Sequence, residues 1–276
     1  MSAFHRHRWT TPLTDPHMKV LEVAKRAADR AGKCLMDMAG KAEIHTKETS
    51  YNLVTEADLE AERLITETIR ETFPDHTFLL EEGQSTGTAE ADHLWIVDPL
   101  DATNNYAHGI PHFSVSIAYA EKGAIQAGVI LDPVRDEWFC AERGKGAFMN
   151  DKPIQVTKSN SLEESVVGTG FYYDRGKLME ATLNSIHTLF KRNVRGIRRM
   201  GSAAIDLCWV ANGRFDAFFE YQLAPWDYSA GKLIIEEAGG KCTDREGNLL
   251  EIESRSVVVG NPAVHELVLD AVRWTG

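Results

Sequence analysis

The spacing of apolar residues predicts two amphipathic helices near the start of the chain. Across residues 14–40 an apolar residue returns every three or four positions, as on one face of a helix. The residues of this face are Val20, Ala24, Ala27, Ala31, Cys34 and Met38. Asp15, Pro16 and Gly40 suit the cap, the first turn and the stop of this helix. A second helix is expected from about Asp58, and its buried side is formed by Ala61, Ile65, Ile69 and Phe73.

Short apolar runs separated by turn-forming residues follow the two helices and predict strands. The runs are TFLL (77–80), LWIVD (94–98), FSVSIAYA (113–120), AIQAGVILD (124–132) and EWFCAE (137–142). The turn residues at 121–123 and 132–133 favour a meander of antiparallel strands. One more hairpin is expected over residues 144–156, with Asn150 and Asp151 at its turn.

After about residue 158 strands and helices alternate. The strands are expected at 165–171, 194–200, 215–220 and 256–260. The helices are expected at 177–192, 202–213 and 227–239. Because this alternation is typical of α/β folds, we expect an α+β subdomain with an antiparallel sheet over residues 1–158, packed on an α/β subdomain over residues 159–276.

The composition is that of an ordinary globular protein, with 276 residues, 43% hydrophobic and 26% charged. No apolar run approaches the roughly 18 residues that span a bilayer, and the first ten residues lack the apolar stretch of a secretory signal. The four cysteines form no CxxC pair, so we expect reduced thiols in a cytoplasmic protein.

The formal net charge of −11 argues against a surface for nucleic acids or anionic membranes, because both need concentrated Lys and Arg. An acidic protein also repels anionic small molecules unless something inverts the local field. Bound cations do this.

Acidic residues cluster where the predicted strands end. Asp98 ends an apolar run, the proline after it favours extended backbone, and Asp101 falls near the start of the next element. Glu81 and Glu82 follow another strand, and Asp227 lies at the start of a helix. Each acid alone is explained by a turn, a solvated loop or a helix N-cap. Their order along the chain is more specific than any one of them.

Five segments together resemble the inositol monophosphatase family of metal-dependent phosphatases, which includes related sugar-phosphate and nucleotide phosphatases. The segments are NLVTEAD (52–58), EE (81–82), DPLDATNNY (98–106), GSAA (201–204) and WDYSAGKLIIEEAGG (226–240). The resemblance runs from about Lys47 to Gly240. It implies a layered αβαβα sandwich, dependence on Mg²⁺, sensitivity to lithium and a homodimer.

The resemblance also implies roles for individual residues. The side-chain metal ligands would be Glu81, Asp98, Asp101 and Asp227, and Leu100 would give its backbone carbonyl. Thr103 and Asp58 would orient or deprotonate the attacking water, with Glu81 beside them. Lys47 and Glu82 would be neighbours of the metal cluster. The substrate would contact Asp101, Ala102, Thr103, Gly201, Ser202, Ala204, Glu220 and Asp227.

Physical chemistry supports the same interpretation. Clustered carboxylates raise one another's pKa unless a cation neutralises them. Oxygen ligands suit Mg²⁺ rather than Zn²⁺, and two or three Mg²⁺ ions would activate water and polarise a phosphate. Helix amides just after Asp101 are also expected to attract phosphate oxygens.

Four positions depart from the family pattern. Ala102 replaces a glycine beside the expected phosphate, which implies a negative φ or a more crowded approach. Asn104 replaces a common threonine, and Leu80 replaces a glycine and is expected to reshape its loop. Asn52 stands where an aspartate is common, which puts in doubt a role for it in holding a weakly bound extra metal ion.

Other phosphatase chemistries fit the sequence less well. Cys208 and Arg214 have the C-x5-R spacing of cysteine-dependent phosphatases, but Cys208 falls on an apolar helical stretch. No DxDx[TV] segment is present, which disfavours an aspartyl-phosphate intermediate. His108 and His112 are interpreted as structural or as neighbours of the site, because Mg²⁺ prefers oxygen.

The leading hypothesis is Mg²⁺-dependent hydrolysis of myo-inositol 1-phosphate by water. The alternatives within this chemistry are histidinol phosphate, fructose 1,6-bisphosphate and adenosine 3',5'-bisphosphate. A different class of function is a regulatory binding protein on the same fold, for example a partner of the transcription machinery.

Overall fold

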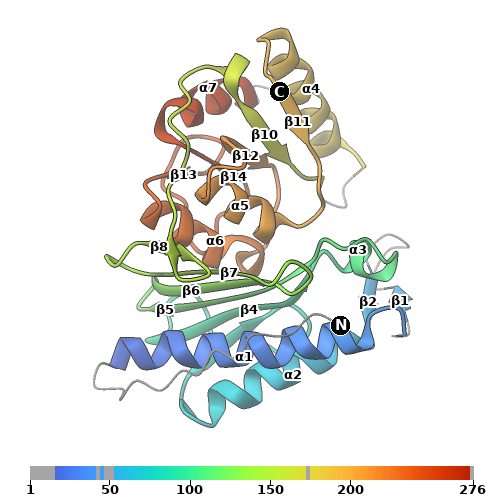
Figure 1. The fold of residues 1–276 in the computed structure, drawn as a ribbon, viewed down its shortest axis with the longest axis vertical. Helices are drawn as coiled ribbons and strands as arrows, with labels where there is room; N and C mark the ends of the chain where they lie inside the picture. The colour runs from blue at the N-terminus through green and yellow to red at the C-terminus, as the bar shows by residue number, and fades with distance from the viewer. Residues whose placement is uncertain (1–15, 42–43, 47–52, 172–174, 274–276) are drawn as a thin grey trace.

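Five layers of helices and sheets make up the computed structural model, which describes residues 16–41, 44–46, 53–171 and 175–273 (Figure 1). Helices α1 and α2 cover the outer face of the first sheet, α5 and α6 lie between the two sheets, and α4 and α7 cover the second sheet. The bounds of these helices are α1 Pro16–Met38, α2 Glu56–Arg70, α4 Lys177–Lys191, α5 Ala203–Ala211, α6 Pro225–Glu237 and α7 Pro262–Val272. The layered αβαβα sandwich is therefore confirmed.

The first sheet has seven strands in the order β3-β4-β5-β6-β7-β8-β9. Their bounds are β3 Thr77–Leu80, β4 His93–Asp101, β5 Ser114–Glu121, β6 Ala124–Asp132, β7 Glu137–Glu142, β8 Ala147–Met149 and β9 Lys152–Pro153. From β4 onward each strand pairs antiparallel with the next, as the turn residues predict. The β8–β9 hairpin turns at Asn150 and Asp151, whose φ values of 48° and 60° suit a type I′ turn.

The prediction of an antiparallel meander is wrong for β3, which pairs parallel with β4. The connection over residues 81–92 contains no hairpin turn and brings the chain back to the end of the sheet where β3 begins. In this register Leu80 lies opposite Val97, so the next residues, Glu81 just after β3 and Asp98 within β4, lie side by side. Parallel pairing thus brings two of the predicted acids to one edge of the sheet.

The second sheet has the order β11-β10-β12-β14-β13. Its strands are β10 Val166–Thr169, β11 Gly196–Arg198, β12 Ala217–Glu220, β13 Lys241–Thr243 and β14 Val257–Gly260. Strand β10 pairs parallel with β11 and β12, as expected for α/β alternation, whereas β14 runs antiparallel to β12 and β13. The sequence analysis missed β13, α7, a short helix α3, a turn of 3₁₀ helix and a strand pair, with bounds α3 Thr103–Ala107, η1 Leu162–Glu164, β1 Ile44–Thr46 and β2 Leu53–Thr55.

Helix α2 begins two residues before the expected start at Asp58, because Thr55 is its N-cap. The Thr55 hydroxyl accepts a hydrogen bond from the Ala57 amide at 3.2 Å. In return the carboxylate of Asp58 accepts one from the Thr55 amide at 2.8 Å. This capping box fixes Asp58 at the end of the helix nearest the acids. Asp15, the expected cap of α1, lies outside the described residues.

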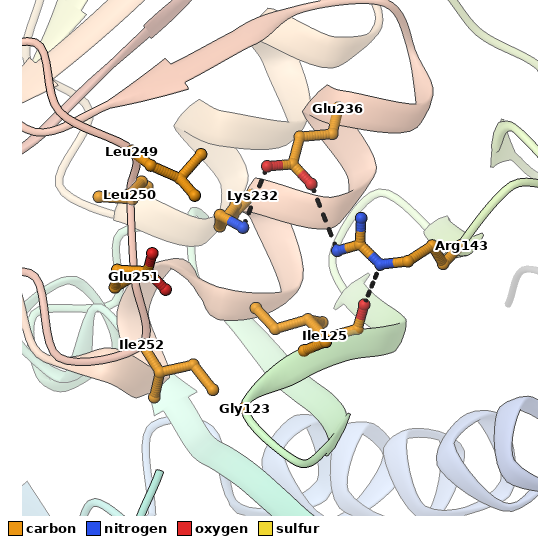
Figure 2. Close-up of a pocket in the computed structure, with 10 residues that line it drawn as sticks. Gly123, Ile125, Arg143, Lys232, Glu236, Leu249, Leu250, Glu251 and Ile252 are labelled. Carbon is orange, nitrogen blue, oxygen red and sulfur yellow. Dashed lines mark hydrogen bonds and ion pairs between the residues drawn. The ribbon is translucent and has the colours of Figure 1, made fainter. Parts of the chain in front are cut away.

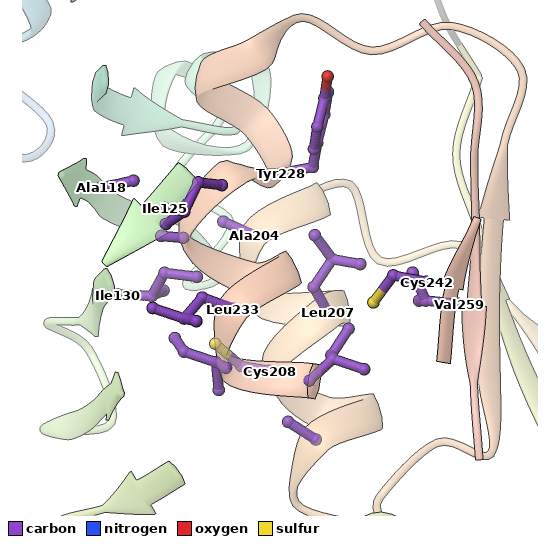
Figure 3. Packing of buried hydrophobic residues seen from close by; sticks show 14 of the residues in the cluster. Ala118, Ile125, Ile130, Ala204, Leu207, Cys208, Tyr228, Leu233, Cys242 and Val259 are labelled. Atoms are coloured by element: carbon purple, nitrogen blue, oxygen red, sulfur yellow. The ribbon is translucent and has the colours of Figure 1, made fainter. Parts of the chain in front are cut away.

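The middle layer joins the two sheets through one hydrophobic core (Figure 3). Leu207 and Cys208 on α5 and Leu233 on α6 are fully buried in this core. They pack between Ile130 of the first sheet and Val259 of the second. Burial on both sides holds the starts of α5 and α6 in place, and each of these starts carries predicted site residues.

Among the described residues, no helix combines the length and the apolar character that crossing a membrane requires.

Candidate active site

The site is built around the end of β4. The strand pairs with β5 in regular register up to Asp98, which faces Ser116, and the register then shifts before Asp101 pairs with Ser114. The Leu100 amide donates to Asp98 Oδ1 at 3.0 Å across this irregularity. Asp98 and Asp101 are 2% and 8% exposed, so two carboxyl groups are buried within three residues of each other. Such burial is costly unless the charges are compensated.

Two further acids join them from other elements. Glu81 follows β3, and Asp227 lies in the first turn of α6. The sequence alone allows Asp227 to be a purely structural N-cap of α6, but Ala224 occupies that position. Asp227 Oδ2 instead accepts from the Ala224 amide at 2.7 Å, which orients its carboxyl group. Three segments of the chain, namely the end of β4, the residue after β3 and the start of α6, therefore meet here.

The four carboxyl groups act on one another electrostatically. Burial is the largest cause of a pKa of Asp98 well above its usual range. Repulsion by neighbouring carboxylates raises this pKa further, and these are Glu81, Asp101 and Asp227. Burial followed by repulsion from Glu81 and Asp101 likewise raises the pKa of Asp227 well above its usual range. Without a cation, burial and repulsion therefore disfavour the ionised form of these carboxyl groups.

Asp101 differs from the other acids because hydrogen bonds hold one of its oxygens. Asp101 Oδ2 accepts from the Ser202 hydroxyl, from the Ala204 amide at 2.9 Å and from the Ser114 hydroxyl at 3.4 Å. Burial raises the pKa of Asp101, and the hydrogen bond from Ser202 is the largest opposing effect. Ser202 and Ala204, expected beside the substrate ring, thus contact the carboxylate of Asp101.

Thr103 and Asp58 are brought together as expected. Thr103 Oγ1 lies 3.0 Å from Asp58 Oδ1 and 3.1 Å from the carbonyl oxygen of Leu100. Asp58 is fully buried, and its other oxygen accepts from the amide and hydroxyl of Thr55. The capping box of α2 therefore fixes the carboxylate that Thr103 contacts.

Ala102 adopts the left-handed conformation, with φ 75° and ψ 48°, so the expectation of a negative φ is wrong. The register shift of β4 before Asp101 and the immediate start of α3 require the chain to turn sharply here. The Tyr106 amide donates to the Ala102 carbonyl at 3.1 Å and holds this turn. Surrounding hydrogen bonds override the ordinary preference of alanine for negative φ.

Glu220 ends β12 on the opposite side of the cluster, and Gly201 lies at the turn before α5. Burial raises the pKa of Glu220 to about 8, with Arg199 opposing the shift. Gly201 has a φ of 99°, a backbone conformation that favours glycine. The predicted substrate residues therefore lie around the acids.

Of the remaining predicted residues, Glu82 donates its amide to Glu62 at 3.0 Å, and Leu80 is buried in the core of the first sheet. Lys47 and Asn52 lie outside the described residues. Cys208 is buried in α5, and burial raises the pKa of its thiol well above the usual range, which argues against a thiolate nucleophile.

The two histidines of the HGIPH segment differ. His108 is exposed and its Nδ1 pairs with the Asn104 carbonyl at 2.8 Å. His112 is buried against the ring of Trp209, and its Nε2 lies 3.9 Å from Asp206. Both histidines are placed as parts of the scaffold.

The donor set fits Mg²⁺ in its chemistry. In the described part of the chain no three His, Cys, Asp or Glu side chains form a ready-made metal site. The acids at the end of β4 nevertheless supply only oxygen atoms, and their raised pKa values arise in part from mutual repulsion. A divalent cation would relieve that repulsion.

One residue of the site was missed by the sequence analysis. Asn105 Nδ2 donates to the carbonyls of His112 at 2.8 Å and Met200 at 3.0 Å, and so links α3 to the turn before α5. Asn105 lies inside the DPLDATNNY segment, but a contact with a residue 95 positions away leaves no periodic signal.

The pocket shown in Figure 2 lies elsewhere, between the β5–β6 turn, α6 and residues 249–252. Its volume is about 310 Å³, and none of the predicted site residues lines it. Three of its four charged side chains pair with one another, since Arg143 and Lys232 both contact Glu236.

Comparison with known proteins identifies the family and agrees with the fold. A sequence model described as the inositol monophosphatase family matches residues 17–275. The chain is 41% identical to an inositol-1-monophosphatase of Rhizobium meliloti over 259 residues, which cover 92% of this chain and 96% of the relative. It is also 39% identical to the Nus factor SuhB of Pseudomonas aeruginosa over 92% of this chain and 96% of the relative.

Solved structures agree as well. The fold matches an IMPase from Thermotoga maritima with a TM-score of 0.85 and 38% identity, over 92% of this chain and 97% of that one. The chain thus belongs to the inositol monophosphatase family and is a phosphatase.

Proposed function

We propose that this phosphatase hydrolyses the phosphate monoester of a polyol, with myo-inositol 1-phosphate as the first candidate, and that the reaction depends on Mg²⁺. The observation that carries the proposal is the meeting of four acidic side chains from three separate segments of the chain beside a buried Thr–Asp pair. Their number and mutual repulsion have no structural purpose without a cation.

The residues that would hold the metal ions are Glu81, Asp98, Asp101, Asp227 and the carbonyl of Leu100. When bound, Mg²⁺ supplies positive charge for the phosphate and lowers the pKa of coordinated water. The protein orients Asp101 before any cation binds, through the Ser202 hydroxyl and the Ala204 amide. Leu100 is fully buried, so its side chain anchors the backbone that would present the carbonyl.

Thr103 and Asp58 would handle the proton of the attacking water. The Thr103 hydroxyl carries one proton, and donating it to Asp58 leaves oxygen lone pairs that can accept from water. A proton leaving that water moves to the Thr103 oxygen as the original hydroxyl proton moves to Asp58. The hydroxide formed in this way would attack phosphorus as the ester P–O bond breaks, with no covalent intermediate on the enzyme, and the leaving alkoxide would take a proton from solvent.

Glu220 would bind a hydroxyl of the substrate at the other side of the cluster. A carboxyl group with a pKa of about 8 is largely protonated at neutral pH and can both donate and accept. An ammonium group would suit the ionised form, which keeps histidinol phosphate as an alternative. Fructose 1,6-bisphosphate and adenosine 3',5'-bisphosphate share the same phosphate chemistry. Comparing kcat/KM across these four esters distinguishes them.

Hydrolysis of inositol 1-phosphate by the Asp101→Asn variant tests the proposal. We expect kcat to fall at least about 100-fold with Mg²⁺ present, because the amide cannot replace a charged ligand. Asp216→Asn is the matched control. Asp216 is buried and accepts hydrogen bonds from Thr157 and Val166, yet it lies outside the acidic cluster. The control should lose thermal stability and keep its kcat, and unchanged turnover in Asp101→Asn would remove the proposal.

A second candidate function is participation in a transcription complex, favoured by the 39% identity to the Nus factor SuhB of P. aeruginosa. Affinity capture with purified RNA polymerase tests it. Equal capture by the wild type and by Asp101→Asn would indicate a function separate from hydrolysis.

The family resemblance adds two proposals. Li⁺ should inhibit hydrolysis, and a titration that leaves the rate unchanged at high Li⁺ would contradict this. The protein should also form a homodimer, which light scattering during gel filtration measures directly.

A further inference from the structure

Asn105 occupies an unusual position between the two sheets. Its side chain is 7% exposed, and its Nδ2 donates to two backbone carbonyls that lie far apart in the sequence, those of His112 and Met200. The first acceptor belongs to the segment before β5, and the second belongs to the turn that leads into α5. One amide group therefore ties together backbone segments on either side of the acidic cluster.

The turn held by Asn105 leads directly to the groups that hold Asp101. Met200 precedes Gly201, whose φ of 99° reverses the chain, and Ser202 follows as the N-cap of α5. A Cβ on Gly201 would lie 3.0 Å from Asn105 Nδ2, so the turn packs closely against this amide. Any movement of the Met200 carbonyl would be transmitted through two residues to the Ser202 hydroxyl.

These contacts close a ring. Asn105 lies four positions after Asp101 and donates a hydrogen bond to the Met200 carbonyl. Ser202 lies two positions after Met200 and donates a hydrogen bond back to Asp101. The hydrogen bonds from Ser114, Ser202 and Ala204 are all accepted by Oδ2, so the ring fixes the orientation of this carboxylate oxygen. Outer contacts of this kind orient metal ligands and set their affinity.

We propose that Asn105 is a positioning residue that holds Asp101 in its metal-binding orientation through the turn at residues 200–202. The inference rests on the proposed function in one respect, namely that Asp101 binds a divalent cation. Asn105 itself contacts neither the cation nor the substrate. It acts through Ser202.

Calorimetric titration of the purified protein with Mg²⁺ tests this without measuring activity. In Asn105→Ala we expect the Kd for Mg²⁺ to rise about tenfold, the lower end of the range for lost outer contacts. The Mg²⁺ dependence of the reaction rate should change in the same way as the Kd for Mg²⁺. The Mg²⁺ concentration for half-maximal rate rises about tenfold, while the substrate KM at saturating Mg²⁺ changes less than about twofold.

Asn261→Ala is the matched control. Asn261 is 2% exposed, its Oδ1 accepts from the Ala263 and Val264 amides at 3.0 Å, and its Nδ2 donates to Thr157 at 2.7 Å. It thus links distant segments as Asn105 does, but far from the acids. Its loss should lower the melting temperature and leave the Kd for Mg²⁺ unchanged. If Asn105→Ala also lost stability with a wild-type Kd, Asn105 would be a structural link only, and the proposal would be overturned.

Two more variants sharpen the experiment. Asn105→Ser keeps one donor proton, which can reach only one of the two carbonyls. It should therefore weaken Mg²⁺ binding with a smaller loss of stability than Asn105→Ala, and it replaces that variant if Asn105→Ala does not fold. Combining Asn105→Ala with Ser202→Ala should weaken binding by less than the product of the two single effects, because both act through one ring. If the double variant weakened Mg²⁺ binding by the full product of the two single effects, this result would contradict the ring. Wild-type protein that binds Mg²⁺ without hydrolysing any ester would refute the proposed function alone, and the variants would still be compared by calorimetry.

Discussion

Replacing Gly170 with alanine should displace the carboxyl group of Glu220 and leave the backbone intact. Gly170 follows β10, and Glu220 ends β12, where the parallel register pairs Thr169 with Phe219. The two residues are therefore neighbours across the strands. A Cβ on Gly170 would lie 2.5 Å from Glu220 Cδ, 2.8 Å from Oε1 and closer still to Oε2. Ordinary van der Waals contact begins at 3.4 Å, so the carboxyl group must move by more than about 1 Å.

A shift of this size has a calculable effect if Glu220 binds the substrate. Misplacing a contact by 1 Å costs up to about 100-fold in rate, which corresponds to about 2.7 kcal/mol of transition-state stabilisation. The φ of Gly170 is not in the left-handed region, so alanine adds no backbone strain. We therefore expect kcat/KM for inositol 1-phosphate to fall between about 10-fold and 100-fold, with Mg²⁺ binding unchanged.

Steady-state kinetics at saturating Mg²⁺ measure this effect, and Gly196→Ala is the control. Gly196 lies on β11, beside β10 in the same sheet, and a Cβ there meets only the flexible side chain of Arg198 at 3.1 Å. The control should keep its kcat/KM. In a Glu220→Asp background, Gly170→Ala should have a smaller effect because the shorter side chain is no longer displaced. A wild-type kcat/KM in Gly170→Ala would refute the reasoning that Glu220 contacts the substrate.

Two other residues give separate predictions. Thr103→Val keeps the shape of the side chain and removes the hydroxyl that donates to Asp58. We therefore expect kcat to fall about 100-fold or more, while the Kd for Mg²⁺ measured by calorimetry stays near that of the wild type. An unchanged kcat would exclude the proton relay. Burial, and then Arg135, lower the pKa of His112 to about 4, so its contribution to stability is lost as pH falls from about 6.5 to 4, because the unfolded chain binds the proton more strongly. The free energy of unfolding of His112→Phe relative to wild type should therefore be higher at pH 5 than at pH 8, by at most about 2 kcal/mol, as melting curves measure. A difference that is independent of pH would contradict this account.

Much of the fold follows from local patterns. Strands β6 (Ala124–Asp132) and β7 (Glu137–Glu142) have the bounds that the apolar runs predict, because turn residues delimit both ends. Helix α7 was missed although Asn261 caps it through the amides of Ala263 and Val264 and Pro262 begins it. That signal is present in the sequence and is readable by the same rules.

Strand direction and backbone strain are different, because neither is encoded locally. Nothing within TFLL distinguishes a parallel β3 from an antiparallel one, since both bury the same face. The left-handed Ala102 contradicts the local preference of alanine, at a cost of about 1–2 kcal/mol. Hydrogen bonds from the Thr103 hydroxyl to the Leu100 carbonyl and from the Tyr106 amide to the Ala102 carbonyl offset that cost.

The acids of the site were recognisable one by one, but their arrangement depends on contacts that span the whole chain. Asp98 and Asp101 are three residues apart and equally acidic in sequence, yet their surroundings differ. Around Asp98, repulsion from three other carboxylates adds to the effect of burial, whereas Asp101 receives hydrogen bonds from Ser202 and Ala204, more than 100 residues away.

This difference gives the two aspartates unequal parts in the assembly of the site. A carboxylate that α5 already holds needs little reorganisation to accept a cation, whereas Asp98 gains most of its compensation only from the cation itself. The turn at Met200 and Gly201 therefore matters as much as the acidic residues, because it carries the start of α5 to Asp101. Sequence alone identifies the charges, and the packing of α5 between the two sheets determines which of them is oriented before Mg²⁺ binds.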